Sequence, residues 1–220
     1  HLILGDVLVL LQLLDLIVAV PPYPAKGVAG LLGVVVDDAI IVVENVDPEI
    51  TLSAGSLNYT ELDPPTIIDA AATLTDPDSA NFDGGLLRVD LGATGSVDDR
   101  LAIHHEGTAA GQIGISGSTV TYGGTPIGTF TGGTDGSDPL TVSFNTDADV
   151  GAVEAVIRNV TFENVSSNPS TTQRSAGFTV SDGDLEDSGT AVVAVTPIES
   201  PAPQGGDGGG EVLPPNQAPG

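Results

Sequence analysis

The sequence predicts an all-β protein, an antiparallel Greek-key β-sandwich with one short helix, preceded by an apolar N-terminal segment. Short runs rich in Val, Ile, Thr and Phe recur along the chain, and Gly, Asn, Asp and Pro separate them. Gly and Pro are abundant, at 29 and 16 residues, whereas aromatic residues make up only 4% of the chain. Such a composition suits many short strands and tight turns better than a bundle of helices.

The 220 residues divide into three parts by composition. Residues 1–46 form an apolar segment, residues 47–198 carry the regular strand pattern, and residues 199–220 are rich in Gly and Pro. The middle part is long enough to bury a core of its own. The last part has too few large apolar side chains to fold alone, so it predicts an interdomain linker.

The strand pattern is regular from residue 50 onward. Tight-turn residues separate the candidate strands, as expected of a sandwich. The expected strands are residues 50–52, 67–74, 86–91, 100–104, 112–115, 119–122, 127–130, 140–144, 156–163, 175–181 and 190–196.

One segment, residues 149–159, has the periodicity of a helix. Val150, Val153 and Ile157 fall on one face of it, and Thr146 or Asp147 could cap its first turn. The sequence therefore predicts a single short helix among the strands.

The chain is strongly acidic, with 30 Asp and Glu against 5 Lys and Arg and a formal net charge of −25. A surface of this sign disfavours nucleic acid and anionic lipid, because both are bound through Lys and Arg. Two interpretations remain: a solubilising acidic exterior, or carboxylates that cluster and are neutralised by divalent cations. Both can hold at once.

Residues for catalysis are sparse, so no enzymatic activity is predicted. The chain has no cysteine, which excludes disulfides and zinc–thiolate sites. His104 and His105 are adjacent and would point to opposite faces of a strand, so they would not chelate one metal ion. No nucleophile-elbow, phosphate-loop or zinc-protease motif occurs.

The N-terminal segment allows several interpretations. Residues 1–20 are almost uniformly apolar, as in a signal peptide or membrane anchor, but Asp6 and Asp15 would be costly within a bilayer. Residues 30–46 read G-L-L-G-V-V-V-D-D-A-I-I-V-V-E-N-V and resemble the helix with paired aspartates in RND-type proton-driven transporters. That resemblance implies a proton-relay role for Asp37 and Asp38, and contact with a membrane through this segment alone.

A second interpretation treats residues 39–46 as the last strand of a preceding repeat. The run A-I-I-V-V-E-N-V, followed by Asp47-Pro48-Glu49, parallels A-V-V-A-V-T-P-I at residues 191–198, followed by Glu199-Ser200-Pro201. A strand and then an acidic, Pro-containing linker would thus occur twice, 152 residues apart. The ends of two successive domains would give this pattern.

Acidic side chains gather in two turns of residues 47–198. Asp76 and Asp78 flank Pro77 and can point to the same side of an extended loop, close to Asn81. Asp182 and Asp184 flank a glycine, which permits a tight turn. Ca²⁺ takes ~6 to 8 oxygen ligands, so either turn alone supplies only part of a site.

These motifs resemble those of cadherin-like repeats, in particular the bacterial modules strung along large cell-surface and RTX-type adhesins. The resemblance covers residues 50–198 and rests on three motifs in the family's order. They are Glu61 in Y-T-E-L-D-P-P, then Asp76, Asp78 and Asn81 in T-D-P-D-S-A-N, then Asp182 in F-T-V-S-D-G-D. The strict D-x-N-D-N linker is not matched, and only Asp98-Asp99-Arg100 could stand for the family's acidic mid-domain motif.

The resemblance implies a cadherin-like or immunoglobulin-like sandwich with Ca²⁺ bound at its poles, where one domain meets the next. Asp76, Asp78, Asn81 and Asp182 would face the preceding linker with Asp47, and Asp184 lies in the same acidic turn as Asp182. Glu61 would face the following junction. The expected function is a calcium-binding, rigidifying repeat of a secreted or cell-surface adhesin, with neighbouring repeats and homophilic or host-surface ligands as partners.

A different function class is a carbohydrate-binding accessory sandwich of an extracellular enzyme. Aromatic side chains on an exposed face would favour it, and the chain holds 3 Tyr (Tyr23, Tyr59 and Tyr122) and 5 Phe. A fragment linked to a membrane transporter is a further alternative, which rests on the N-terminal segment alone.

Overall fold

The structure is a computed structural model that describes residues 28–36 and 39–198, with side chains described from Asn45 onward. Strands dominate, with one α-helix, α2 (Val150–Arg158), and one 3₁₀ turn, η1 (Gly92–Thr94), within that part of the chain. The strands are β1 (Val28–Val36), β2 (Ala39–Val46), β3 (Glu49–Thr51), β4 (Ser56–Thr60), β5 (Thr66–Ile67), β6 (Thr73–Thr75), β7 (Leu86–Asp90), β8 (Asp99–Ile103), β9 (Ile113–Ser116), β10 (Thr119–Tyr122), β11 (Thr125–Thr131), β12 (Leu140–Phe144), β13 (Val160–Asn164), β14 (Arg174–Ser181) and β15 (Glu186–Thr196).

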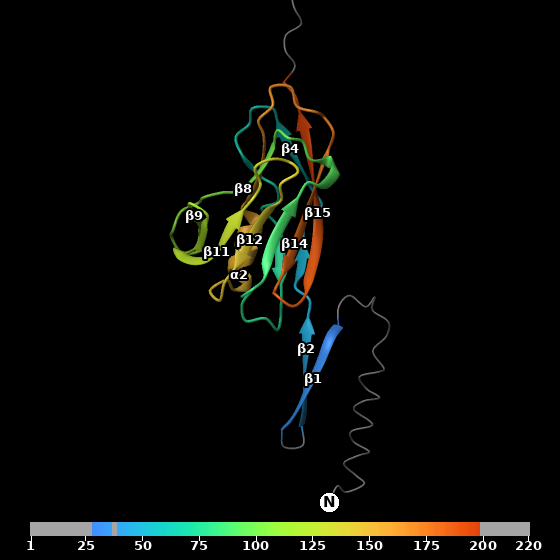
Figure 1. Ribbon diagram of the computed structural model, residues 1–220, viewed down its shortest axis with the longest axis vertical. Coiled ribbons are helices and arrows are strands. Elements are labelled where there is room, and N and C mark those ends of the chain that lie inside the picture. Colours follow the sequence, from blue (N-terminus) through green and yellow to red (C-terminus); the bar gives the residue numbers. More distant parts are fainter. Residues whose placement is uncertain (1–27, 37–38, 199–220) are drawn as a thin grey trace, which may run out of the picture.

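One layer is an eight-stranded sheet with the strand order β4-β15-β14-β7-β12-β11-β10-β9 (Figure 1). Its neighbours pair antiparallel, except that β4 runs parallel to β15. Buried and exposed residues alternate along β7, β12 and β14, because successive side chains of a strand point to opposite faces. The sheet thus presents one apolar face to the core.

The second layer combines the three-stranded sheet β5-β13-β8, the short pair β3-β6 and helix α2. Its buried side chains join those of the large sheet in one hydrophobic cluster. Tyr59 of β4 meets Phe162 of β13 edge to face, with ring centroids 5.2 Å apart, which ties the two layers together. The predicted all-β sandwich is therefore confirmed, with one parallel pair as the departure from an antiparallel arrangement.

The predicted helix is present but begins with a different cap. Asp149 is the N-cap, and its carboxylate accepts a hydrogen bond from the backbone N–H of Ala152 at 2.7 Å. Asp147 does not cap the helix. Its backbone N–H instead donates to the side-chain oxygen of Asn145. The helix continues through Arg158, so the strand expected over residues 156–163 begins only at Val160.

The strand expected over residues 67–74 is broken in two. The buried Asp69 carboxylate accepts hydrogen bonds from the backbone N–H and hydroxyl of Ser53 and from the N–H of Ala71. These bonds fold residues 69–72 into a turn, which sends β5 and β6 to different sheets. Sequence reasoning also left β4 out of the strand list, although its Tyr59 is fully buried.

Residues 28–36 and 39–46 form two paired strands rather than a helix. β1 and β2 pair antiparallel, with Val36 opposite Ala39. The helix implied by the transporter resemblance is therefore wrong, and the interpretation of residues 39–46 as a strand is confirmed. No helix within residues 28–36 and 39–198 is long and apolar enough to cross a membrane. Asp37, Asp38 and the expectations for residues 1–27 and 199–220 lie outside the described residues.

The body of the sandwich is elongated, with β2 joining it at one end and β15 stopping at the opposite end (Figure 1). We call the end where β2 joins the body the N-terminal pole; the turns after β6 and β14 lie there. We call the end where β15 stops at Thr196 the C-terminal pole. Glu61 lies there because its N–H donates to the Thr196 carbonyl, and the start of β8 lies there because Asn164 bonds both Asp99 and Tyr59.

Candidate functional site

The pairing of β3 with β6 delivers two acidic side chains to the N-terminal pole. These strands pair antiparallel with Glu49 opposite Thr75. Asp47 lies two residues before Glu49, and Asp76 directly follows Thr75. The antiparallel register therefore places Asp47 and Asp76 beyond the same end of the ladder.

Ser79 joins the two acidic turns that lie far apart in the sequence. Its backbone N–H donates to Asp76 Oδ1 at 3.0 Å, and its hydroxyl donates to Asp182 Oδ2 at 3.0 Å. Asp78 extends this group toward the incoming strand, because its Oδ2 accepts the N–H of Val46 at 3.1 Å. The Asp76 loop and the Asp182 turn thus share one pole.

Two carboxylate oxygens at this pole are buried and have no hydrogen-bond partner among the described residues: Asp47 Oδ1 and Asp76 Oδ2. Buried polar atoms are nearly always paired, since an unpaired one loses its contacts with water and gains nothing in exchange. A bound cation would satisfy an oxygen of this kind, and carboxylates are donors that Ca²⁺ prefers. The residues present therefore fit an oxygen-coordinated cation.

The other predicted ligands at this pole are placed differently. Asn81 Oδ1 accepts the N–H of Asp83 at 3.1 Å, and Asp184 is exposed. Asp182 Oδ1 already accepts the N–H groups of Asp184 and Leu185, which shapes the turn. No group of three or more His, Cys, Asp or Glu is arranged to hold a metal ion within the described part of the chain. Carbonyl, amide or hydroxyl oxygens would have to complete a calcium shell.

Glu61 lies at the C-terminal pole, away from the other candidates. Its side chain is buried, and its Oε2 accepts the N–H of Ile198 at 2.8 Å. Its own backbone N–H donates to the carbonyl of Thr196. Glu61 therefore holds the point at which the chain leaves the last strand.

In the stretch Asp98-Asp99-Arg100, Asp99 belongs to the interior of the C-terminal pole rather than to an open acidic motif. Asp99 is fully buried and pairs with the buried Arg174, whose Nε lies 2.9 Å from Asp99 Oδ2. Asn164 Nδ2 and the backbone N–H of Ser96 also donate to the Asp99 carboxylate. All of these contacts come from protein groups. Sequence reasoning missed Arg174 and Ser79, because their partners are more than 70 residues away.

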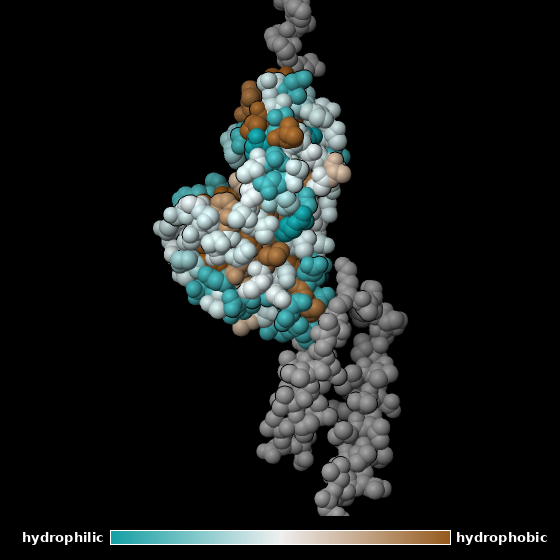
Figure 2. Space-filling model, viewed as in Figure 1, coloured by the Kyte–Doolittle hydropathy of each residue, from teal (hydrophilic) through white to brown (hydrophobic). Residues whose placement is uncertain are grey.

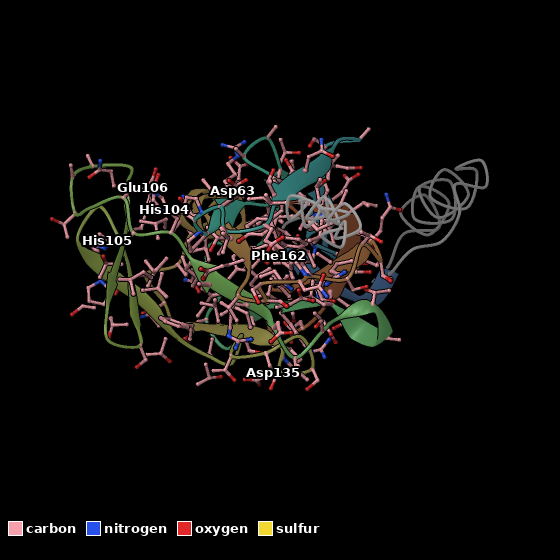
Figure 3. All side chains as sticks on the ribbon, turned by 90° about the horizontal axis from the view of Figure 1, so that it is seen from above. Asp63, His104, His105, Glu106, Asp135 and Phe162 are labelled. Carbon is pink, nitrogen blue, oxygen red and sulfur yellow. The ribbon has the colours of Figure 1, made fainter. Side chains whose placement is uncertain are left out.

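Two side chains have shifted pKa values. Burial raises the pKa of the Tyr59 phenol, which donates to the carbonyl of Asp63 at 2.6 Å near the C-terminal pole. Hydrogen bonds from the Ser137 hydroxyl and N–H lower the pKa of the half-buried Asp135. Figure 3 shows Asp135 and the His104–Glu106 loop at the periphery of the molecule. Neither shift belongs to the group around Asp76.

Comparisons with protein-family models, with curated proteins and with solved structures gave no match to this chain.

Proposed function

We propose that this chain is a calcium-binding structural repeat of a secreted or cell-surface adhesin. It would act as a rigidifying spacer, without catalysis, between neighbouring repeats of the same protein. The observation that carries the proposal is the pair of buried, unpartnered oxygens Asp47 Oδ1 and Asp76 Oδ2 at the pole where the preceding strand joins the sandwich.

The connection through Asp78 supports a role at a junction. Asp78 belongs to the sandwich, and it binds the backbone of Val46, the last residue of β2. Asp47 lies on the connecting segment itself, whereas Asp76 lies on the body. An ion held by both would restrain the connecting segment against the body.

Charge gives the reason for a dependence on metal. The chain carries a net charge of −25, and Asp47, Asp76, Asp78 and Asp182 all lie at the same pole. Like charges so close together repel one another. When bound, Ca²⁺ would supply the positive charge that offsets this repulsion, so binding would stabilise the folded state.

Titration of the full chain with Ca²⁺ tests the proposal. We expect binding by calorimetry with a Kd of about 10⁻⁴ to 10⁻³ M, as in extracellular modules. At a hundredfold excess over Kd, the ion adds about 2.7 kcal/mol, which raises Tm by roughly 5–10 °C relative to chelator.

The variant Asp76→Asn should weaken calcium binding at least tenfold, since it removes one charge from the shell. Asp135→Asn removes the same charge from a turn outside the group around Asp76, where Asp135 bonds Ser137, and should leave Kd unchanged, which makes it the matched control. A Tm that is the same in Ca²⁺ and in chelator, with no heat of binding, would refute a calcium site.

A further inference from the structure

A second candidate site lies away from both poles, between helix α2 and the β9–β10 arm. A cavity of about 370 Å³ opens there, within the size range of small-ligand sites. Its polar and aromatic lining comes from the loop before β9, from the end of β10 and from the last turns of α2. These side chains are Glu106, Tyr122, Glu154, Arg158 and Asn159.

The carboxylate and amide of this cavity are held in place before any ligand arrives. Glu106 Oε2 accepts the N–H of Ile113 at 2.9 Å and the side-chain amide of Asn159 at 3.3 Å. The same amide donates to the carbonyl of Ala155, which fixes the Asn159 rotamer. Glu106 Oε1 and Asn159 Oδ1 lie outside these bonds, so each can accept a hydrogen bond from a ligand.

The charged pair on the helix is fixed in the same way. Glu154 Oε1 lies 2.8 Å from Arg158 Nη1, and Glu154 Oε2 accepts the N–H of Leu74. Arg158 Nε donates to the carbonyl of Ala72 at 2.6 Å, which leaves Nη2 outside these bonds. Because the two charges offset one another, the pair offers hydrogen bonds rather than net charge.

Tyr122 gives the cavity an apolar wall with a polar tip. It is half-buried and packs against the hydrophobic core at the end of β10. A ring of this kind favours a ligand with an apolar face and a hydroxyl rim. Sequence reasoning named Tyr122 only as one of three tyrosines, because the residues that surround it come from distant parts of the chain.

We propose that this cavity binds a neutral sugar residue of a glycan. Hydroxyl groups both donate and accept, which matches the acceptors Glu106 and Asn159 and the donor Arg158. A phosphate or carboxylate ligand would be repelled by Glu106 on a chain of net charge −25, whereas a neutral ligand meets no such repulsion. The cavity has room for one or two sugar rings, and preorganised lining groups lower the cost of binding.

The sugar site does not depend on the calcium proposal, because the cavity and the N-terminal pole share no lining residue. Either proposal can fail while the other stands. Sugar binding is therefore to be measured with Ca²⁺ and with chelator.

The experiment follows the backbone amide resonances of the full, ¹⁵N-labelled chain during titration with neutral sugars. The probes are glucose, galactose, mannose, N-acetylglucosamine and their disaccharides, with glucuronic acid as the anionic comparison. We expect at least one neutral sugar to shift the amides of Glu106, Tyr122 and Asn159 at about millimolar Kd, and glucuronic acid to bind more weakly.

Gly151 provides a way to block the cavity without harming the fold. It lines the cavity from an exposed position of α2, where an added Cβ would meet only Asp149 Oδ1 at 3.5 Å. Leu is a better helix former than Gly, so Gly151→Leu should fold at least as well and abolish sugar binding. Gly151→Ala also favours the helix but adds only a methyl group, so it should retain binding and serves as the matched control.

Two further variants separate the ring from the hydroxyl of Tyr122. Tyr122→Ala should weaken binding about tenfold, whereas Tyr122→Phe should keep most of the affinity. Arg88→Ala, in a separate cavity on the outer face of the large sheet, should have no effect. The inference is overturned if no neutral sugar shifts these amides, or if Gly151→Leu binds as well as Gly151→Ala.

Discussion

The two poles of the sandwich bury their acidic side chains in opposite ways. At the C-terminal pole, Asp99 receives hydrogen bonds from Arg174, Asn164 and Ser96, all supplied by the protein. At the N-terminal pole, Asp47 and Asp76 each bury one carboxylate oxygen without such a partner. A buried carboxylate is tolerated only with compensating contacts. Asp99 is therefore a structural charge, whereas one oxygen each of Asp47 and Asp76 lacks a hydrogen-bond partner among the described residues.

The surfaces around the two poles differ as well. Large apolar side chains are exposed around the C-terminal pole, where Leu62 and Val97 are 73% and 74% exposed. Val165 and Ile198 lie beside them, because Val165 bonds to Asp98 and Ile198 bonds to Glu61. Figure 2 shows this apolar surface at the upper end of the molecule. The N-terminal pole instead presents acidic turns. The C-terminal pole thus offers apolar contacts, whereas the N-terminal pole offers carboxylate groups.

The largest expected effect is at the C-terminal pole. Asp99→Asn leaves the buried Arg174 charge uncompensated and should lower the free energy of unfolding by about 3–5 kcal/mol. Urea denaturation of the full chain measures this change. Asp90→Asn is the control, since it breaks the more exposed Arg88–Asp90 pair and should cost less than about 1 kcal/mol. Equal decreases in the free energy of unfolding in the two variants would show that burial does not determine how much each ion pair contributes to stability.

Alkaline pH should also act on the C-terminal pole, through Tyr59. Burial raises the pKa of Tyr59 in the folded state above its ordinary value of 10.0. Below pH 10 the neutral Tyr59 phenol makes its full contribution to the free energy of unfolding. That contribution is lost as the pH rises through the folded-state pKa. The slope there is at most about 1.4 kcal/mol per pH unit.

The variant Tyr59→Phe isolates this alkaline effect. It removes the hydrogen bond to Asp63 and should lower stability at neutral pH by about 1 kcal/mol. Its stability should then fall less steeply above pH 10 than that of the parent chain. Parallel curves for the two proteins above pH 10 would assign the alkaline loss to other groups.

At the N-terminal pole an Asp→Asn substitution should change the free energy of unfolding in the opposite direction to Asp99→Asn. Without calcium, Asp76→Asn removes one negative charge from an acidic pole, where Asp76 Oδ2 is buried without a hydrogen-bond partner, while the amide oxygen can still accept the Ser79 N–H. In chelator we expect the variant's free energy of unfolding to exceed that of the parent chain by about 1 kcal/mol. In Ca²⁺ we expect it to be lower than that of the parent chain. Urea denaturation in both buffers measures this reversal. A loss in chelator would mean that Asp76 is satisfied by the protein, like Asp99.

The smallest expected effect concerns Leu62 in the apolar surface. Leu62 has φ of +68°, a left-handed conformation that an L-residue adopts at a cost. Asn tolerates this region, so Leu62→Asn should stabilise the chain by about 0.5 kcal/mol, measured as a rise in Tm. Leu62→Ala keeps the strain and serves as the control. A destabilised Leu62→Asn variant would show that the exposed side chain makes contacts that matter to folding.

The fold class and several elements followed from the sequence, because strand periodicity and turn residues act over short distances. The strands at residues 119–122 and 140–144 have the predicted bounds. Failures occurred where a side chain reached across the fold. Asp69 breaks a continuous apolar run by bonding Ser53, and Asp149 takes the cap that Thr146 or Asp147 was expected to form.

The composition of the candidate site also followed from the sequence, since Asp76 and Asp182 stand in recognisable turns. Their shared location was implied only by the cadherin-like resemblance and not by local sequence rules, because it depends on Ser79 bridging 103 residues and on the register of β3 with β6. The sequence by itself determined an acidic, strand-rich chain with carboxylates at its turns. Only the tertiary structure decided which carboxylates are paired by the protein and which are left unpaired, because burial and hydrogen bonding are properties of the packed chain.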